Sequence, residues 1–183
     1  MSYRSEKDKA LYIQNRTKTD GTIIVNNAYE AGNSFGLVYD HLKTINVYGE
    51  INIEVSKEFQ LSGSINYSNY TTDIELEAWN LPEIKAIVSA EYRMKKWFVG
   101  TQIFFNGNTK DYVISYSDLP ENGIVNTNKS YLDLNFNGGY TISDRLSVFT
   151  KLNNVIGENY QRFTNYPVQS FQVLGGVIYK FDL

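Results

Sequence analysis

The sequence has no cysteine and only one histidine, and these two scarcities exclude several kinds of site. Without cysteine there is neither a disulfide framework nor a metal centre ligated by thiolates. A single histidine excludes zinc and iron sites built on pairs or clusters of histidines. His41 lacks a serine or cysteine partner, so we interpret it as a loop residue and not as a catalytic base. We find no catalytic constellation, predict no cofactor or metal, and expect that the protein is not an enzyme.

Long apolar runs and an excess of charge of one sign are missing as well. No stretch approaches the roughly 20 apolar residues of a membrane helix, which excludes helical spanning but not strands that are only half apolar. The net charge is −3, and the only basic run is Lys95-Lys96, which reads as a turn. Nucleic acid is therefore not a predicted partner.

Tyrosine is the residue that the sequence has in unusual abundance. There are 15 Tyr, 10 Phe and 2 Trp among 183 residues. Together with frequent Asn, Thr and Ser, this composition favours strands over helices. Tyrosine combines a ring that tolerates hydrocarbon with a hydroxyl that seeks water, so it collects at membrane interfaces. A tyrosine-rich soluble β-sandwich has a similar composition and stays open as an alternative.

Alternation of apolar and polar residues predicts long strands joined as hairpins. Residues 45–56 alternate throughout, which exceeds the usual length of soluble strands and suits a tilted membrane strand. A two-residue connection at Lys57-Glu58 leads into a second alternating run over 59–68. The same hairpin unit recurs at residues 86–94 with 97–105 and at 132–140 with 146–152, and a last alternating strand covers 171–183.

The connections between these strands are short and long in turn. Those near residues 57, 95 and 143 are short, whereas 72–82, 106–129 and 154–167 are long and carry Asn, Asp, Gly and Pro. Short turns at one rim and long loops at the other are typical of an outer-membrane barrel. The pattern predicts a Gram-negative outer-membrane location, with long loops outside the cell and short turns and the C-terminus in the periplasm.

The predicted fold class is all-β: an antiparallel up-and-down transmembrane β-barrel, or part of one, with about eight or nine strands. The whole chain, 1–183, is one barrel segment. Residues 44–183 carry the hairpin repeat, whereas residues 1–40 are weakly patterned, with candidate strands at 10–16 and 22–28. An even strand number puts both termini in the periplasm, so either 10–16 is not a strand or the chain is the tail of a longer barrel.

Four motifs near the C-terminus carry a family resemblance: LSVF at 146–149, LNNVIGENY at 152–160, YPVQ at 166–169, and GGVIYKF at 175–181. With these motifs the chain resembles a TonB-dependent outer-membrane receptor of the type common in Bacteroidetes. In that family such segments open the last outer loop, lead back from it, and close the final strand. The similarity extends over about residues 132–181.

The resemblance implies a 22-stranded barrel with a plug in its lumen, which imports a scarce nutrient with energy delivered through TonB. We recognise no plug, TonB box or signal in this short chain, so we expect it to match only the last strands. The implied partners are outer-membrane lipid, the barrel assembly machinery, and the N-terminal strands and plug of the same receptor. Two alternatives stay open: a small self-closing eight-stranded outer-membrane protein, and a soluble β-barrel that binds an apolar ligand.

Two sets of residues are candidates for sites on such a barrel. Aromatic residues near strand ends are predicted to form interfacial girdles, with a soluble aromatic core as the alternative. The girdle candidates are Tyr67, Trp79, Tyr92, Trp97, Tyr131, Tyr140, Tyr160, Tyr166 and Phe181. Polar residues opposite the apolar faces are predicted to line the lumen, or to face water in a soluble sheet. The lumen-lining candidates are Glu50, Asn52, Glu54, Asn66, Glu91, Arg93, Gln102, Asn135, Lys151 and Lys180.

One group of acidic residues in the long connection 106–129 could hold calcium through its carboxylates. Asp111, Asp118 and Glu121 offer carboxylate oxygens, but their spacing fits no calcium-loop motif. We therefore interpret them as residues of a solvated loop.

Overall fold

A computed structural model describes residues 1–15, 34–113, 124–164 and 166–181. Its main feature is one antiparallel sheet of eight strands in the order β1-β2-β3-β4-β5-β8-β9-β12. These strands are β1 (Ser2–Asn15), β2 (Ser34–Glu54), β3 (Phe59–Thr71), β4 (Ile84–Arg93), β5 (Trp97–Asn106), β8 (Tyr131–Thr141), β9 (Leu146–Asn153) and β12 (Gln172–Tyr179). The predicted all-β, antiparallel, up-and-down architecture is thereby confirmed. None of the described residues forms a helix of the length and apolar content needed to span a bilayer.

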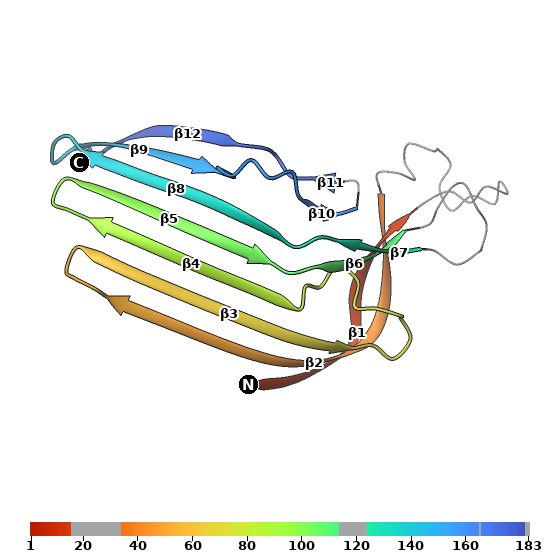
Figure 1. The fold of residues 1–183 in the computed structure, drawn as a ribbon. Coiled ribbons are helices and arrows are strands. Elements are labelled where there is room, and N and C mark those ends of the chain that lie inside the picture. Colours follow the sequence, from red (N-terminus) through yellow and green to blue (C-terminus); the bar gives the residue numbers. More distant parts are fainter. Residues whose placement is uncertain (16–33, 114–123, 165, 182–183) are drawn as a thin grey trace.

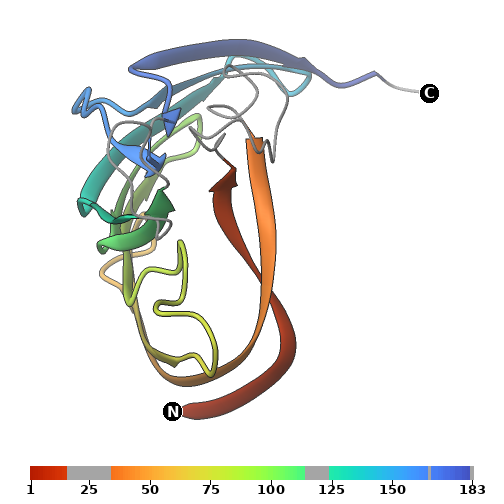
Figure 2. The same ribbon diagram turned by 90° about the vertical axis from the view of Figure 1, so that its right-hand side faces the viewer.

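The sheet is curved along its width, and its two outermost strands do not meet. Figure 1 shows the strands side by side, with short turns at one end and longer connections at the other. Viewed along the strands, the sheet bends into an arc with an open side (Figure 2). Within the described residues β1 and β12 stand at opposite ends of the strand order and are not paired with each other. The sheet is thus an open arc and not a closed ring.

Two small hairpins occupy connections that the sequence predicted as loops. β6 (Thr109–Val113) pairs with β7 (Ile124–Asn128) between β5 and β8. β10 (Gln161–Phe163) pairs with β11 (Tyr166–Pro167) between β9 and β12. Both hairpins lie at the long-loop end of the arc (Figure 1). Their strands are too short to show clear alternation, which is why periodicity did not reveal them.

The N-terminal strands are longer than the sequence predicted. β1 begins at Ser2 and pairs with β2 from Asn46 back to Ser34, with a bulge between Glu6 and Lys9. Charged residues at positions 4–9 interrupt the apolar–polar alternation, and the bulge shifts the pairing register of β1. The pattern therefore indicated a strand only from position 10. The candidate strand at 22–28 lies outside the described residues.

The two faces of the sheet differ in polarity and in exposure. The convex face carries most of the exposed Ile, Val and aromatic residues of the sheet; Ile51 is 59% exposed, Val88 54% and Val177 66%. Within the described residues no second sheet or helix covers them. The fully buried apolar side chains are Leu11, Leu42 and Trp79, all near the long-loop end. The burial of apolar side chains is therefore concentrated at the long-loop end of the arc and not along the rest of the eight-stranded sheet.

Candidate functional site

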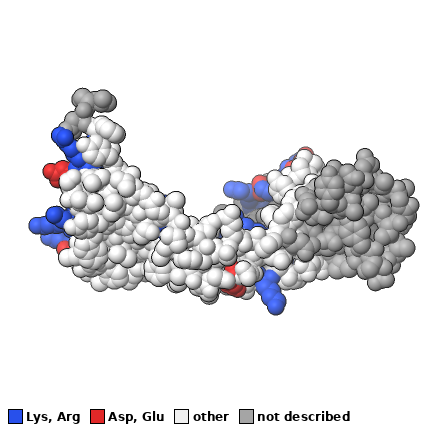
Figure 3. All heavy atoms as spheres, turned by 90° about the horizontal axis from the view of Figure 1, so that it is seen from above, with Lys and Arg blue, Asp and Glu red and all other residues white. Residues whose placement is uncertain are grey.

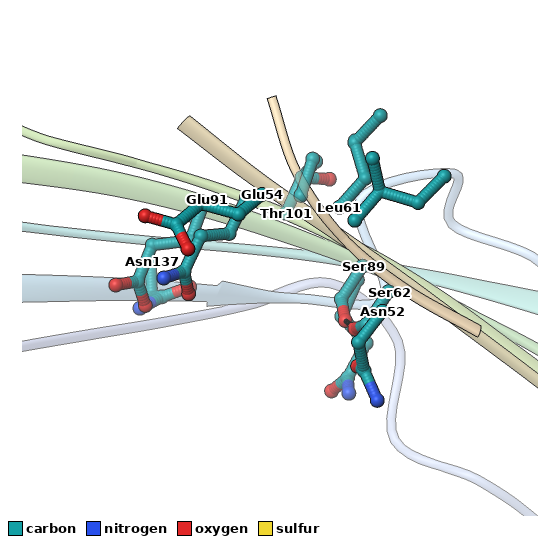
Figure 4. Close-up of a pocket in the computed structure, with 13 residues that line it drawn as sticks. Asn52, Glu54, Leu61, Ser62, Ser89, Glu91, Thr101 and Asn137 are labelled. Carbon is teal, nitrogen blue, oxygen red and sulfur yellow. Dashed lines mark hydrogen bonds between the residues drawn. The ribbon is translucent and has the colours of Figure 1, made fainter. Parts of the chain in front are cut away.

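The concave face of the arc is polar, and cross-strand pairing aligns its side chains in rows. One row runs through Glu54, Gln60, Glu91, Gly100, Asn137 and Lys151. The next runs through Asn52, Ser62, Ser89, Gln102 and Asn135. Most residues of the two rows border an open cavity of about 660 Å³. In Figure 4, Asn52, Ser62 and Ser89 point to one side of the sheet and Leu61 and Thr101 to the other.

Side chains of the concave face bond to one another. The hydroxyls of Ser62 and Ser89 lie 2.6 Å apart across β3 and β4. The Asn46 amide donates to Asn66 Oδ1 at 2.8 Å across β2 and β3. Hydrogen-bonded networks hold polar side chains in defined orientations. The face is therefore an ordered polar surface that offers hydroxyl, amide and carboxylate groups to a polar partner.

The structure brings nine of the ten lumen-lining candidates together on this one face. They are Glu50, Asn52, Glu54, Asn66, Glu91, Arg93, Gln102, Asn135 and Lys151. Lys180 follows β12 and lies at the short-turn end, where its backbone N–H donates to the Arg145 carbonyl at 2.9 Å. That the shared face lines a lumen stays a prediction.

At the short-turn end of the concave face, an arginine makes a cation–π contact and an ion pair. Arg93 pairs with Glu91 at 2.7 Å, and its guanidinium lies 5.1 Å from the centre of the Phe98 ring. Phe98 in turn covers Gly139, where a Cβ would stand 2.5 Å from a ring carbon. Any side chain at position 139 would displace the ring. Glycine at this position therefore lets Phe98 lie flat beneath the cation.

Five of the nine girdle candidates are exposed. Tyr67, Tyr92, Trp97 and Tyr140 lie on the convex face at 37–45% exposure, and Phe181 is 79% exposed just beyond β12. Their position at a membrane interface stays a prediction.

The girdle prediction is wrong for Trp79 and Tyr160, because their rings are covered by protein, and for the half-buried Tyr131 and Tyr166 it stays a prediction. Trp79 is 1% exposed and Tyr160 is 7% exposed, so neither can reach a surrounding solvent. Tyr131 lies on the concave face and stacks on Tyr160, with ring centres 3.6 Å apart. Tyr166 packs its ring 4.9 Å from that of Phe35. Position near a strand end did not indicate burial, because a long loop can fold back into the arc and bring its aromatic residues with it.

Trp79 belongs to the connection between β3 and β4, which folds inside the arc (Figure 2). Its indole N–H donates to Glu75 at 2.7 Å, and its ring lies 5.4 Å from that of Tyr112 on β6. The neighbouring Asn80 adopts φ +61° and donates its amide to the Tyr12 carbonyl on β1. The connection is thus a packed element that joins β1 and β6.

The same connection is anchored by a buried carboxylate that sequence reasoning missed. Asp40 is 2% exposed and accepts the backbone N–H groups of Asp73, Ile74 and Glu75, the last at 2.7 Å. It also accepts the N–H of His41 at 2.6 Å. A carboxylate that takes several backbone donors fixes the turn that supplies them. Asp40 therefore positions the start of the segment that carries Trp79.

Replacing Asp40 by alanine is expected to destabilise the fold by about 2–3 kcal/mol, because three turn N–H groups lose their acceptor. Hydrogen exchange at the amides of Asp73, Ile74 and Glu75 should accelerate, and urea titration of the lipid-bound chain should show the loss. Asp144→Ala, which removes an exposed carboxylate in the distant turn between β8 and β9, is the control. Unchanged exchange in Asp40→Ala would show that the turn holds without it.

Tyr160 forms a second buried polar contact at the long-loop end. Its hydroxyl donates to Asp133 Oδ2 at 2.9 Å. Burial, followed by this hydrogen bond to a carboxylate, raises the pKa of Tyr160 to about 12. Both causes penalise the tyrosinate, since it would be poorly hydrated and would face a negative charge.

A pH dependence follows from that raised pKa. The stability that the neutral phenol contributes is complete below about pH 10, the ordinary pKa of tyrosine, and is lost as the pH rises through about 12. In ultraviolet titration Tyr160 should ionise with the unfolding transition, and Tyr160→Phe should remove its contribution from that part of the curve. A Tyr160→Phe protein that keeps the same delayed ionisation would contradict the assignment.

His41 has partners that the sequence did not indicate. Its Nε2 lies 2.6 Å from Ser5 Oγ on β1, and its Nδ1 lies 3.1 Å from Asp73, which also pairs with Lys43 at 2.7 Å. The interpretation of His41 as a loop residue without a serine partner is thus wrong, because β1 pairs with β2 and brings Ser5 beside it. Neither Ser5 nor His41 borders the concave cavity of about 660 Å³. The cluster ties β1, β2 and the folded connection together.

Asp111 is also not the solvated loop residue that the sequence predicted. It lies in β6, is fully buried, and accepts the Asn128 amide at 2.9 Å and the backbone N–H of Thr164 at 2.5 Å. The two other acidic residues of this group, Asp118 and Glu121, lie outside the described residues. Asp111 therefore joins the β6–β7 hairpin to the end of β10.

Comparisons with known proteins bear on this arrangement through the fold. No protein-family model matches the sequence, and no curated protein matches it. Among solved structures, the pyoverdine outer membrane receptor FpvA from Pseudomonas aeruginosa PAO1 matches 98% of this chain with a TM-score of 0.68 and 16% identity. The copper transporter OprC gives 0.68 at 10% identity, and the siderophore receptor PiuA from Acinetobacter baumannii gives 0.63 at 11%, each over 98% of this chain.

These matches cover only part of the solved structures. The chain spans 26% of FpvA, 28% of OprC and 25% of PiuA, about a quarter of each. Its fold is that of the C-terminal barrel part of TonB-dependent outer-membrane receptors. The resemblance that the C-terminal sequence motifs carry is thereby confirmed at the level of the fold.

Proposed function

We propose that this chain is a wall segment of a TonB-dependent outer-membrane receptor, with its convex face in lipid and its concave face toward the lumen. The observation that carries the proposal is the exposure of large apolar side chains on the convex face of seven of the eight strands, opposite a face that carries rows of polar side chains. Water disfavours so large an apolar surface, whereas acyl chains do not. A soluble barrel that binds an apolar ligand requires the opposite arrangement.

The open arc supports a part of a larger barrel over the small self-closing barrel. β1 and β12 each have one neighbour in the described sheet. Unpaired backbone groups at a strand edge are costly in lipid. Further strands of the same receptor would satisfy these edges, and the barrel assembly machinery would be the partner that inserts them. A plug domain would then face the polar rows of the concave side.

The ligand class is taken from the solved structures of the same fold. FpvA is described bound to pyoverdine, PiuA as a siderophore receptor, and OprC as a copper transporter. We infer that the complete receptor imports a small metal-bearing nutrient. This chain would contribute the concave rows and the long-loop end to its pathway.

The orientation can be tested because the chain has no cysteine of its own. Leu76 is 79% exposed in the β3–β4 connection, and Asp144 is exposed in the short turn between β8 and β9. Leu76→Cys and Asp144→Cys variants are produced with a secretion signal in a Gram-negative host and treated on intact cells with a membrane-impermeant maleimide. We expect Leu76→Cys to react on intact cells and Asp144→Cys only after lysis.

Three other outcomes are informative. Labelling of Asp144→Cys alone would reverse the orientation. Labelling of both positions on intact cells, or recovery of the chain from the soluble fraction without detergent, would contradict membrane insertion. The unsubstituted chain, which has no thiol to label, is the background control.

A further inference from the structure

The short turns of the arc lie side by side along one rim, because backbone hydrogen bonds join each turn to the next strand. The Arg93 N–H donates to the Glu58 carbonyl at 2.7 Å, and the Thr141 N–H donates to Lys96 at 2.6 Å. The Lys180 N–H donates to Arg145 at 2.9 Å. Side chains of successive turns are therefore neighbours along a continuous edge.

Basic residues predominate at this rim. Its cations are Lys57, Lys95, Lys96, Arg145 and Lys180, and the acids of its turns are Glu58 and Asp144. All seven residues are exposed. Figure 3 shows Lys and Arg at the short-turn end of the molecule, with acidic residues beside them, and further Lys and Arg along its length. Within the described residues, none of the four lysines takes part in an ion pair.

A belt of aromatic rings lies directly beside the basic rim on the convex face. The rings of Phe59 and Tyr92 lie 6.2 Å apart, and those of Tyr92 and Trp97 lie 5.4 Å apart. Trp97 is paired with Tyr140 in the next strand, and Tyr179 on β12 extends the belt. Such rings settle at the level of lipid headgroups. The lysines of the turns are then at headgroup level or just beyond it.

At the long-loop end some of the cations pair with acidic residues of the protein, whereas Lys7, Lys110 and Lys129 are in none of the ion pairs of the described residues. Lys43 pairs with Asp73 at 2.7 Å, and Lys9 pairs with Glu6 at 3.2 Å. Arg4 lies 4.0 Å from Glu6. Among the described residues, the short-turn rim places four lysines that are in no ion pair directly beside an aromatic belt.

We propose that the short-turn rim binds the anionic headgroups of phospholipids and enriches them around the wall. The proposal rests on the proposed function, since it needs the convex face to be in lipid. A lysine at a negatively charged surface gains electrostatic attraction that falls off within a Debye length. The electrostatic attractions of the four rim lysines add together at the leaflet that lies beside the aromatic belt.

Trp97 reports the local lipid directly. It is 38% exposed beside Lys95-Lys96, whereas Trp79, the other tryptophan, is 1% exposed inside the arc. The full chain is reconstituted in phosphatidylcholine vesicles that contain an equal fraction of brominated phosphatidylglycerol or brominated phosphatidylcholine. Bromine quenches tryptophan on contact, so quenching measures which lipid surrounds Trp97. We expect phosphatidylglycerol to be preferred by at least about threefold, and the preference to fade in about 1 M salt.

Two variants with the same charge change locate the preference. In the rim variant, Lys57, Lys95, Lys96 and Lys180 become glutamine. In the control, Lys7, Lys9, Lys110 and Lys129 at the other end become glutamine. We expect the rim variant to lose the preference and the control to keep it.

The remaining outcomes separate the two proposals. Equal quenching by both brominated lipids in the unsubstituted chain overturns lipid selection but leaves membrane embedding intact. A preference that the rim variant retains also overturns it. If neither lipid quenches Trp97, the convex face is not in lipid and both proposals fail.

Discussion

Arginine in place of Ile103 is expected to destabilise the lipid-embedded chain by about 2–4 kcal/mol, whereas arginine at the adjacent Gln102 should have little effect. Ile103 lies on the convex face of β5, paired with Val88 and Leu134, midway between the two ends of the arc. Gln102 borders the open polar cavity. The two residues are neighbours in sequence, so they share depth and strand and differ only in the face.

Urea titration of both variants in phosphatidylcholine vesicles measures this difference. Comparable losses for Ile103→Arg and Gln102→Arg would mean that both faces meet the same solvent, and the assignment of the convex face to lipid would fail. A smaller loss when Ile103→Arg is moved from vesicles to short-chain detergent micelles would be consistent with lipid contact, since a micelle adapts more readily to a charged side chain.

Truncation of Trp79 to alanine is expected to cost about 3–5 kcal/mol, the range of large aromatic-to-alanine changes in protein cores. The ring is 1% exposed, packs near Tyr112, and donates to Glu75. Its removal leaves a void at the end of the arc where apolar burial is concentrated. The loss should appear in urea titration and in faster proteolysis of the connection between β3 and β4.

Trp97→Ala is the matched control for that experiment. Trp97 is 38% exposed on the convex face, so its removal creates no internal void. We expect it to leave proteolysis of the β3–β4 connection unchanged. If both tryptophan variants lose the same stability and protease resistance, Trp79 is not the anchor of the folded connection.

The sequence by itself determined the strands, faces and hairpins of the main sheet. Residues 45–56 and 59–68 alternate so regularly that strand, face and hairpin follow from the two-residue period of a β-strand. The observed pairing of Glu54 with Gln60 puts the turn at the predicted place in the chain, although the connection takes in residues 55–58 and not only the two predicted ones. The polar set, including Glu91 and Gln102, falls on one face for the same reason. Periodicity is a local property, and a strand needs no knowledge of distant residues to display it.

Only the tertiary structure decided what lies inside the arc. Trp79 and Tyr160 are buried, and Asp111 accepts bonds from Asn128 and Thr164, because connections fold back against strands far away in the sequence. Asp40 is an anchor only because residues 73–75 bring their N–H groups to it. Burial and polar satisfaction depend on such non-local contacts, and alternation within one strand carries no record of them. The openness of the arc is equally a property of the whole sheet.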